Sequence, residues 1–207
     1  MNYNYEFINY EFGLPVKIFI NSDNSYKPHF HKGLELIWVL DGRATLLIDR
    51  EEHILRENDL LLINSFKSHT IVESSERTTY LVMHIDDNFC AKYLPDFYNR
   101  HFEVRSSKSE QDDQGKYDSI RYGFSKIVWA YNKKVKNFRD VINDELAKLF
   151  TYIAENFTKA DLSGQDLDSE KRDWLKIKKI INYIEEHYQE KLTLQEIADR
   201  EHYNLSY

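Results

Sequence analysis

Residues 34–49 read LELIWVLDGRATLLID, two apolar runs separated by the pair Asp41-Gly42. An Asp-Gly pair between apolar runs predicts a tight hairpin turn, because glycine readily adopts the positive φ that such turns need. Further short apolar runs lie on either side, bounded by polar reversals: VKIFIN, HILRE, DLLLIN, HTIVE and TTYLVMHID. Strands of this length at such close spacing predict an antiparallel barrel over about residues 16–85.

The period of the apolar residues changes after these runs. Between residues 120 and 157 they recur at steps of three and four, which predicts two amphipathic helices and therefore a helical hairpin. Two interpretations remain open: the helices only pack on the barrel, or an exposed stripe also pairs with a second subunit. For a homodimer, we expect the contact residues Val141, Ile142, Leu146, Leu149 and Ile153.

Two polar stretches predict the domain boundaries. Residues 105–116 read RSSKSEQDDQGK, and residues 159–173 read KADLSGQDLDSEKRD without an apolar period, as in an interdomain linker. We expect four parts: a barrel with an N-terminal arm over 1–104, a helical segment over 105–158, a linker over 159–173 and a second, all-α domain over 174–207. The chain is therefore predicted to be of the α+β class.

The last part of the chain predicts two helices and the start of a third. Residues 174–188 place apolar side chains on one helical face, and Thr193 and Glu196 have capping-box spacing, so a second helix is expected to begin at Leu194. Asn204 is a competent N-cap for a third helix. This order is typical of helix-turn-helix proteins. The residues expected in the motif are Thr193, Glu196, Ile197, Ala198, Asn204, Ser206 and Tyr207.

The carboxy-terminal sequence KIKKIINYIEEHYQEKLTLQEIADREHYNLSY resembles the opening of the AraC/XylS-type DNA-binding domain. His202 stands where that family often has glycine, and Asn204 replaces a serine. Both changes are compatible with the motif, because histidine can adopt a positive φ and asparagine caps a helix as well as serine does. The resemblance implies that the protein is a transcription regulator and not an enzyme. It also implies an effector-sensing barrel, helices that form a homodimer, and a DNA-binding domain that, when complete, has two helix-turn-helix units. Since the chain stops as the first recognition helix begins, we expect it to bind DNA weakly or not at all. A generic three-helix bundle remains the alternative for this segment.

A second resemblance lies in the barrel. The sequence HFHKGLE at residues 29–35, followed by Gly42, resembles the first cupin motif, and His69 falls where the second motif has its histidine. Residues two apart in a strand share a face, so His29 and His31 can point into one cavity and Glu35 can join them across a strand pair. His53, His84 and His101 lack comparable spacing, and we expect them to be structural or exposed.

The two resemblances imply different occupants for this cavity. AraC-type sensor barrels imply a small-molecule effector and no cofactor, with an effector cavity that we expect to include His29, His31, Glu35, Trp38, His69, Tyr80 and Met83. Cupin enzymes imply instead that three imidazoles and one carboxylate hold a divalent transition-metal ion. The metal ligands would then be His29, His31, Glu35 and His69, and the alternative function is a cupin-type metalloenzyme.

Composition limits the partners of the chain. The net charge is −7, whereas DNA is bound largely through basic residues, so any DNA contact must be local. Cys90 is the only cysteine, which excludes an intramolecular disulfide and a cysteine-cluster metal site within one chain. The amino-terminal sequence MNYNYEFINYEFGLP lacks the features of a signal peptide, and no apolar run approaches the length of a membrane span. We expect a cytoplasmic protein that does not contact membranes.

Overall fold

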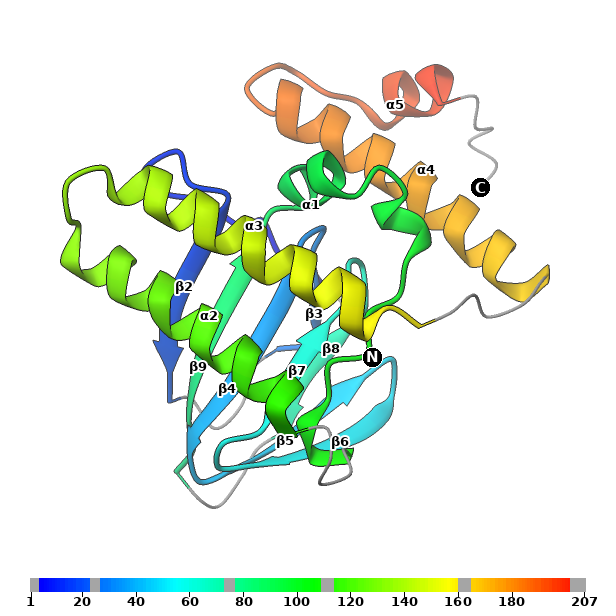
Figure 1. The fold of residues 1–207 in the computed structure, drawn as a ribbon. Coiled ribbons are helices and arrows are strands. Elements are labelled where there is room, and N and C mark those ends of the chain that lie inside the picture. Colours follow the sequence, from blue (N-terminus) through cyan, green and yellow to red (C-terminus); the bar gives the residue numbers. More distant parts are fainter. Residues whose placement is uncertain (1–3, 23–26, 73–76, 109–113, 160–164, 202–207) are drawn as a thin grey trace. The chain divides into compact units, whose positions relative to one another are not determined.

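The computed structural model describes most of the chain (Figure 1). The described ranges are 4–22, 27–72, 77–108, 114–159 and 165–201. The chain divides into two compact units, Met1–Ala160 and Asp161–Tyr207. Among the described residues, no helix is both long and apolar enough to cross a bilayer.

The first unit is built on two sheets, one with the strand order β1-β3-β8-β5-β6 and one with the order β2-β9-β4-β7. The strands are β1 Asn4–Tyr5, β2 Val16–Asn21, β3 His29–Phe30, β4 Leu34–Asp41, β5 Arg43–Ile48, β6 Glu51–Arg56, β7 Leu60–Ile63, β8 His69–Val72 and β9 Thr79–Ile85. All strand pairs are antiparallel except β1 with β3. The predicted antiparallel barrel is confirmed.

The turn at Asp41-Gly42 differs from the prediction in what it connects. Gly42 has the expected positive φ, 83°, but β4 pairs with β7 and β9, so the turn carries the chain from one sheet to the other and closes no hairpin. A Cβ on Gly42 would lie 2.6 Å from the carbonyl oxygen of Arg77, so the corner needs glycine for space as well. The two-residue hairpin turn is instead Asp49-Arg50, between β5 and β6, with φ values of 48° and 74°.

Strand β4 is buried on both of its faces, because alternate residues belong to different cores. One core lies between the two sheets and contains Ile37, Val39, Ala44, Leu46, Leu55, Leu61, Ile63, Tyr80 and Val82. The other joins the outer face of the four-stranded sheet to helices, and its strand residues include Leu34, Leu36, Leu60, Leu62, Leu81 and Met83.

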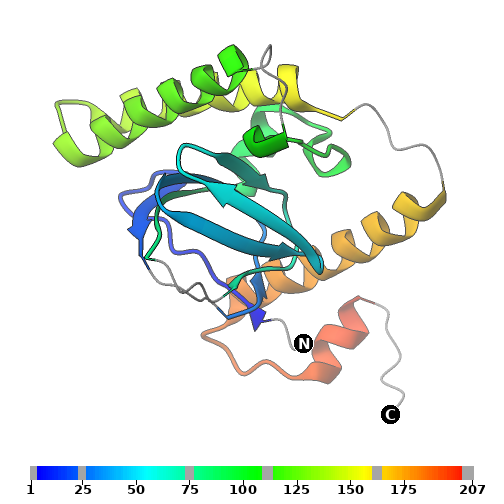
Figure 2. The same ribbon diagram turned by 90° about the horizontal axis from the view of Figure 1, so that it is seen from below.

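Helices α2 (Gln114–Lys133) and α3 (Phe138–Phe157) form the predicted hairpin and cover the outer face of the four-stranded sheet (Figures 1 and 2). The shorter elements are α1 Asp87–Tyr93 and the 3-10 turns η1 Phe97–Asn99 and η2 Ser106–Lys108. Most of the expected dimerisation residues pack inside the chain: Ile142, Leu146, Leu149 and Ile153 are buried in this core, whereas Val141 is 37% exposed. The hairpin therefore packs on the barrel through these residues.

The second unit contains α4 (Gln165–His187) and α5 (Leu194–Arg200). The predicted capping box is present at α5: the Glu196 N–H donates to Thr193 Oγ1 over 3.2 Å, and the Thr193 N–H donates to Glu196 Oε2 over 2.9 Å. Ala198 is buried and Ile197 half-buried. Asn204, Ser206 and Tyr207 lie outside the described residues.

Helix α4 begins earlier than expected. Gln165 already belongs to it, so much of the stretch predicted as linker, residues 159–173, is helical. After Gly164 this stretch contains neither glycine nor proline and is rich in good helix formers. An apolar period predicts only helices that bury one face. A helix can extend without burying a face, so the missing period did not exclude a helix here.

Candidate functional site

Five buried polar side chains meet between the two sheets: His29, His31, Glu35, His69 and His84. His29 lies opposite His69 in the pairing of β3 with β8, and Glu35 lies opposite His84 in the pairing of β4 with β9. Each sheet thus contributes one pair. The ring of His31, in the segment between β3 and β4, stacks on that of His84 with centroids 4.9 Å apart.

Glu35 is the centre of this group, and one of its oxygens meets three imidazoles. Oε2 of Glu35 lies 2.9 Å from Nε2 of His31, 2.9 Å from Nε2 of His69 and 3.7 Å from Nε2 of His84. The fourth imidazole, His29, has its Nε2 3.0 Å from Oε2 of Glu6, which follows β1. Every histidine of the group therefore directs Nε2 towards a carboxylate.

The other ring nitrogen is held by the backbone in three of the four histidines. Nδ1 lies 2.9 Å from the Lys27 carbonyl oxygen in His29, 3.1 Å from that of Gly33 in His31 and 2.8 Å from that of Lys67 in His69. A carbonyl oxygen only accepts hydrogen bonds, so Nδ1 is the donor in each. The lone pair of the neutral ring then lies on Nε2, which is the tautomer that a metal ligand needs.

The charges of the group are strongly coupled. Burial raises the pKa of Glu35, but His69 and His84 outweigh this and hold it well below its usual value. Burial lowers the pKa of His29 to about 4 and that of His84 to about 3. For His69, burial lowers the pKa, yet the Glu35 carboxylate more than compensates and raises it. At neutral pH the His29 and His84 rings are therefore neutral, whereas the Glu35 carboxylate favours the protonated form of His69.

This donor set fits a divalent transition-metal ion. The ligand atoms of His29, His31, Glu35 and His69 all lie within 4.8 Å of one another. Metal–ligand bonds of about 2.1 Å place neighbouring donors of one ion about 3 Å apart, and the two short distances to Glu35 match that spacing. The four residues predicted from the motif therefore form a candidate metal site.

The other residues expected in an effector cavity are divided between two cores. Tyr80 lies between the sheets, in the same core as Val82. Trp38 and Met83 instead belong to the opposite face of β4 and β9, under the helices, so the structure does not bring them together with the histidines. Trp38 donates from Nε1 to Oδ1 of Asn58 over 3.2 Å.

Two members of the site were missed from the sequence. His84 was expected to be structural or exposed, yet it is 3% exposed and lies beside Glu35. The signal was available, because His84 is four residues after Tyr80 in one strand and must share its face. Glu6 carried no comparable signal, since it follows a strand of only two residues that precedes the barrel.

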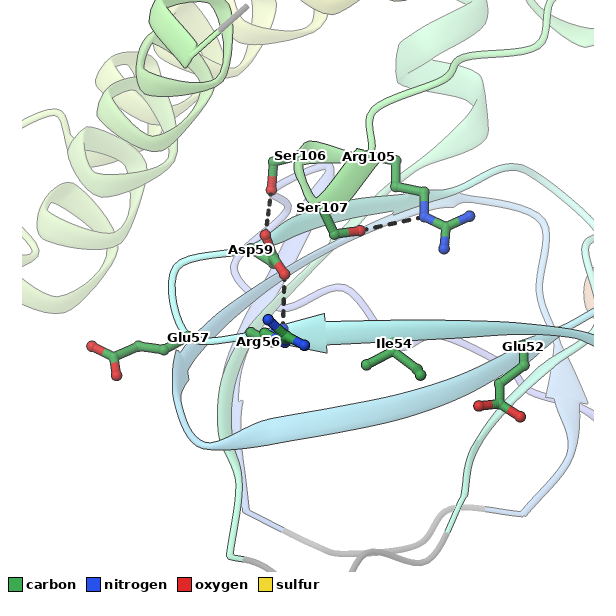
Figure 3. A pocket seen from close by; sticks show the side chains of 8 residues that line it. All are labelled: Glu52, Ile54, Arg56, Glu57, Asp59, Arg105, Ser106 and Ser107. Atoms are coloured by element: carbon green, nitrogen blue, oxygen red, sulfur yellow. Dashed lines mark hydrogen bonds between the residues drawn. The ribbon is translucent and has the colours of Figure 1, made fainter. Parts of the chain in front are cut away.

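Two pockets lie elsewhere on the first unit. The one in Figure 3, about 610 Å³, is lined by Glu52, Ile54, Arg56, Glu57, Asp59, Arg105, Ser106 and Ser107. Asp59 accepts from the backbone N–H of Arg56 and from the Ser106 hydroxyl, and Arg105 donates to Ser107 over 3.4 Å. A neighbouring cavity of about 630 Å³ includes Tyr117 of α2. The side chains of the first pocket carry both signs of charge and so do not select a ligand class.

The first unit is a two-sheet, cupin-like barrel with a histidine and carboxylate group and a covering helical hairpin, and the second unit contains a capped short helix. Residues 18–111 match the AraC-like ligand binding domain. This match agrees with the resemblance of the carboxy-terminal sequence to the AraC/XylS-type transcription regulators.

Two curated relatives are HTH-type transcriptional regulators by name, and one solved structure shares the fold. The uncharacterised HTH-type transcriptional regulators YdeC and YbfI of Bacillus subtilis strain 168 are 25% and 20% identical to it, over 89% and 83% of the chain. The chain spans 66% of the length of the first and 59% of the second. An apo ToxT variant from Vibrio cholerae shares the fold, with a TM-score of 0.54 and 13% identity over 93% of this chain and 72% of that one.

Proposed function

We propose that this chain supplies the sensing and dimerisation part of a cytoplasmic AraC-type transcription regulator, which binds DNA through a complete helix-turn-helix domain that includes α5. The observation that carries the proposal is the combination, in one chain, of an AraC-like ligand-binding barrel with a helix that begins at a formed capping box. The test is selection of bound sequences from a random DNA library, using the protein expressed from its full native gene. Enrichment of one sequence is expected, and a library that stays random would contradict the proposal.

For the homodimer, we propose a contact through the outer face of α2. The dimerisation residues expected from the sequence are mostly buried, but Tyr122 and Trp129 are 67% and 55% exposed. They are seven residues apart and share one helical face. Exposed aromatic residues are enriched in protein interfaces, and a two-fold dimer would pair this face with itself.

Replacing Trp129 with glutamate is expected to convert the dimer to a monomer, because two charges would be buried at the symmetric contact. Light scattering after gel filtration measures the mass directly. Tyr93→Glu is the matched control, since Tyr93 is an exposed aromatic residue on α1. A Trp129→Glu protein that remains dimeric, or a wild-type protein that is monomeric at micromolar concentration, would contradict this contact.

We further propose that the barrel site holds a divalent transition-metal ion through His29, His31, Glu35 and His69. The proposal is supported by three imidazoles whose Nδ1 atoms are held by the backbone, and by the ligand atoms of these imidazoles and of Glu35, which all lie within 4.8 Å of one another. When bound, the ion would supply positive charge to a buried group that contains a carboxylate. A cupin-type enzyme would need the same ion, but the relatives of the chain are regulators.

Metal analysis of untagged protein purified without chelator tests this site. We expect about one transition-metal ion per chain in the wild type and less than a tenth of that in His69→Ala, because one of four ligands is lost. His101→Ala is the control, since His101 lies outside the site. Wild-type protein that stays free of metal after dialysis against zinc, manganese, iron and nickel salts would contradict the proposal.

A further inference from the structure

The N-terminal arm of the barrel is attached as an additional strand beside the candidate metal site. Strand β1 runs parallel to β3, with Asn4 opposite His29 and Tyr5 opposite Phe30. The N–H of Asn4 donates to the Pro28 carbonyl oxygen over 3.1 Å, and the N–H of Glu6 donates to that of Phe30 over 2.9 Å. These backbone bonds place the Glu6 side chain next to a histidine of the site.

The contact between Glu6 and His29 joins the arm to the site. Oε2 of Glu6 lies 3.0 Å from Nε2 of His29, and the two side chains are 28% and 9% exposed. Nδ1 of His29 already donates to the Lys27 carbonyl, so Nε2 is the atom of this ring that is left for a metal ion, and it is also the atom that meets Glu6. Glu6 thus lies one contact outside that group.

We propose that Glu6 is a further carboxylate ligand of the metal ion, so that metal binding fastens the N-terminal arm to the barrel. The inference rests on the metal site proposed above. A separation of 3.0 Å is the distance expected between neighbouring donors of one ion. The Glu6 side chain is partly exposed and so has room to turn towards the ion.

Charge balance supports the same assignment. Histidine ligands bind a metal ion as neutral imidazoles, so in the four-residue group only Glu35 offsets the two positive charges. A buried ion with an unbalanced charge is costly. The Glu6 carboxylate supplies the second negative charge, which makes the group neutral. The ion would then link the arm to both sheets, because His29 and His69 belong to one sheet and Glu35 belongs to the other.

The experiment measures zinc affinity by titration against a chromophoric chelator, on metal-free protein. Glu6→Ala is expected to bind zinc at least tenfold more weakly than the wild type, since loss of a group next to the metal usually costs ten- to a hundredfold in affinity. The control is Glu11→Ala, which removes the same charge from an exposed residue of the same arm and should change the affinity less than twofold. Equal or tighter binding by Glu6→Ala would overturn the proposal.

Hydrogen exchange of the arm gives a second readout. Zinc should slow exchange of the backbone amides of residues 4–8 in the wild type and in Glu11→Ala, but not in Glu6→Ala. If the wild type binds zinc and its arm exchanges at the same rate as before, the arm link is wrong while the four-residue site stands. If the wild type binds no zinc, both are wrong.

Discussion

A Glu35→Ala protein is expected to lose divalent metal binding by at least a hundredfold and to be about 3 kcal/mol less stable than the wild type, with both proteins metal-free. Glu35 is 6% exposed and its Oε2 lies near Nε2 of His31, His69 and His84. Removing Glu35 leaves a buried group of imidazoles without the carboxylate that raises the pKa of His69. Urea unfolding and the zinc titration measure the two effects separately.

Glu103→Ala is the matched control for this change. Glu103 is exposed and its Oε1 lies 2.7 Å from Nζ of Lys159, so the pair is a surface ion pair. Such pairs contribute at most about 1 kcal/mol. A Glu35→Ala protein that unfolds at the wild-type urea concentration would show that the buried group needs no carboxylate, and the account of the site would be wrong.

Gly33→Ala is expected to destabilise the first unit by about 2 kcal/mol or more and to weaken zinc binding at least tenfold. Gly33 lies between His31 and Glu35, and a Cβ there would overlap the backbone carbonyl oxygen of Ile85 in β9. The backbone must therefore shift, and it carries both ligands, as well as the carbonyl that holds Nδ1 of His31. Thermal unfolding and zinc titration measure the outcome.

Gly115→Ala is the control for the glycine change. Gly115 lies in α2, and a Cβ there meets nothing within 4 Å. Alanine favours the helix by up to about 1 kcal/mol over glycine, so Gly115→Ala should be neutral or slightly stabilising. If Gly33→Ala were as stable as Gly115→Ala, the close approach between Gly33 and β9 would not exist in the folded protein.

The sequence predicts the fold class well because the periods of its apolar residues are local signals. Short apolar runs predicted the strands, and apolar residues at steps of three and four predicted α2 and α3. Which strands a turn connects depends on long-range pairing, which is not a local signal. Gly42 has the expected positive φ, but the pairing of β4 with β7 and β9 means that the Asp41-Gly42 turn joins two sheets. The start of α4 at Gln165 was missed because helix propensity acts without an apolar stripe.

The candidate site was predicted only in part, because only some of its residues are grouped by local spacing. The spacing of His29, His31 and Glu35 is local, so these residues could be grouped from the sequence, and His69 followed from the motif. Trp38 could not be placed correctly, because β4 is apolar on both faces and only the helices that cover one face distinguish them. Glu6 reaches the site through the pairing of β1 with β3, which two residues of strand do not predict.

Native mass spectrometry of the untagged wild-type protein tests the central claim most directly, because one spectrum reports the subunit number and the bound metal. We expect a dimer that carries one divalent transition-metal ion per chain, and the mass of each ion identifies the metal. A spectrum of metal-free chains, from protein purified without chelator and then supplied with zinc, manganese, iron and nickel, would contradict it.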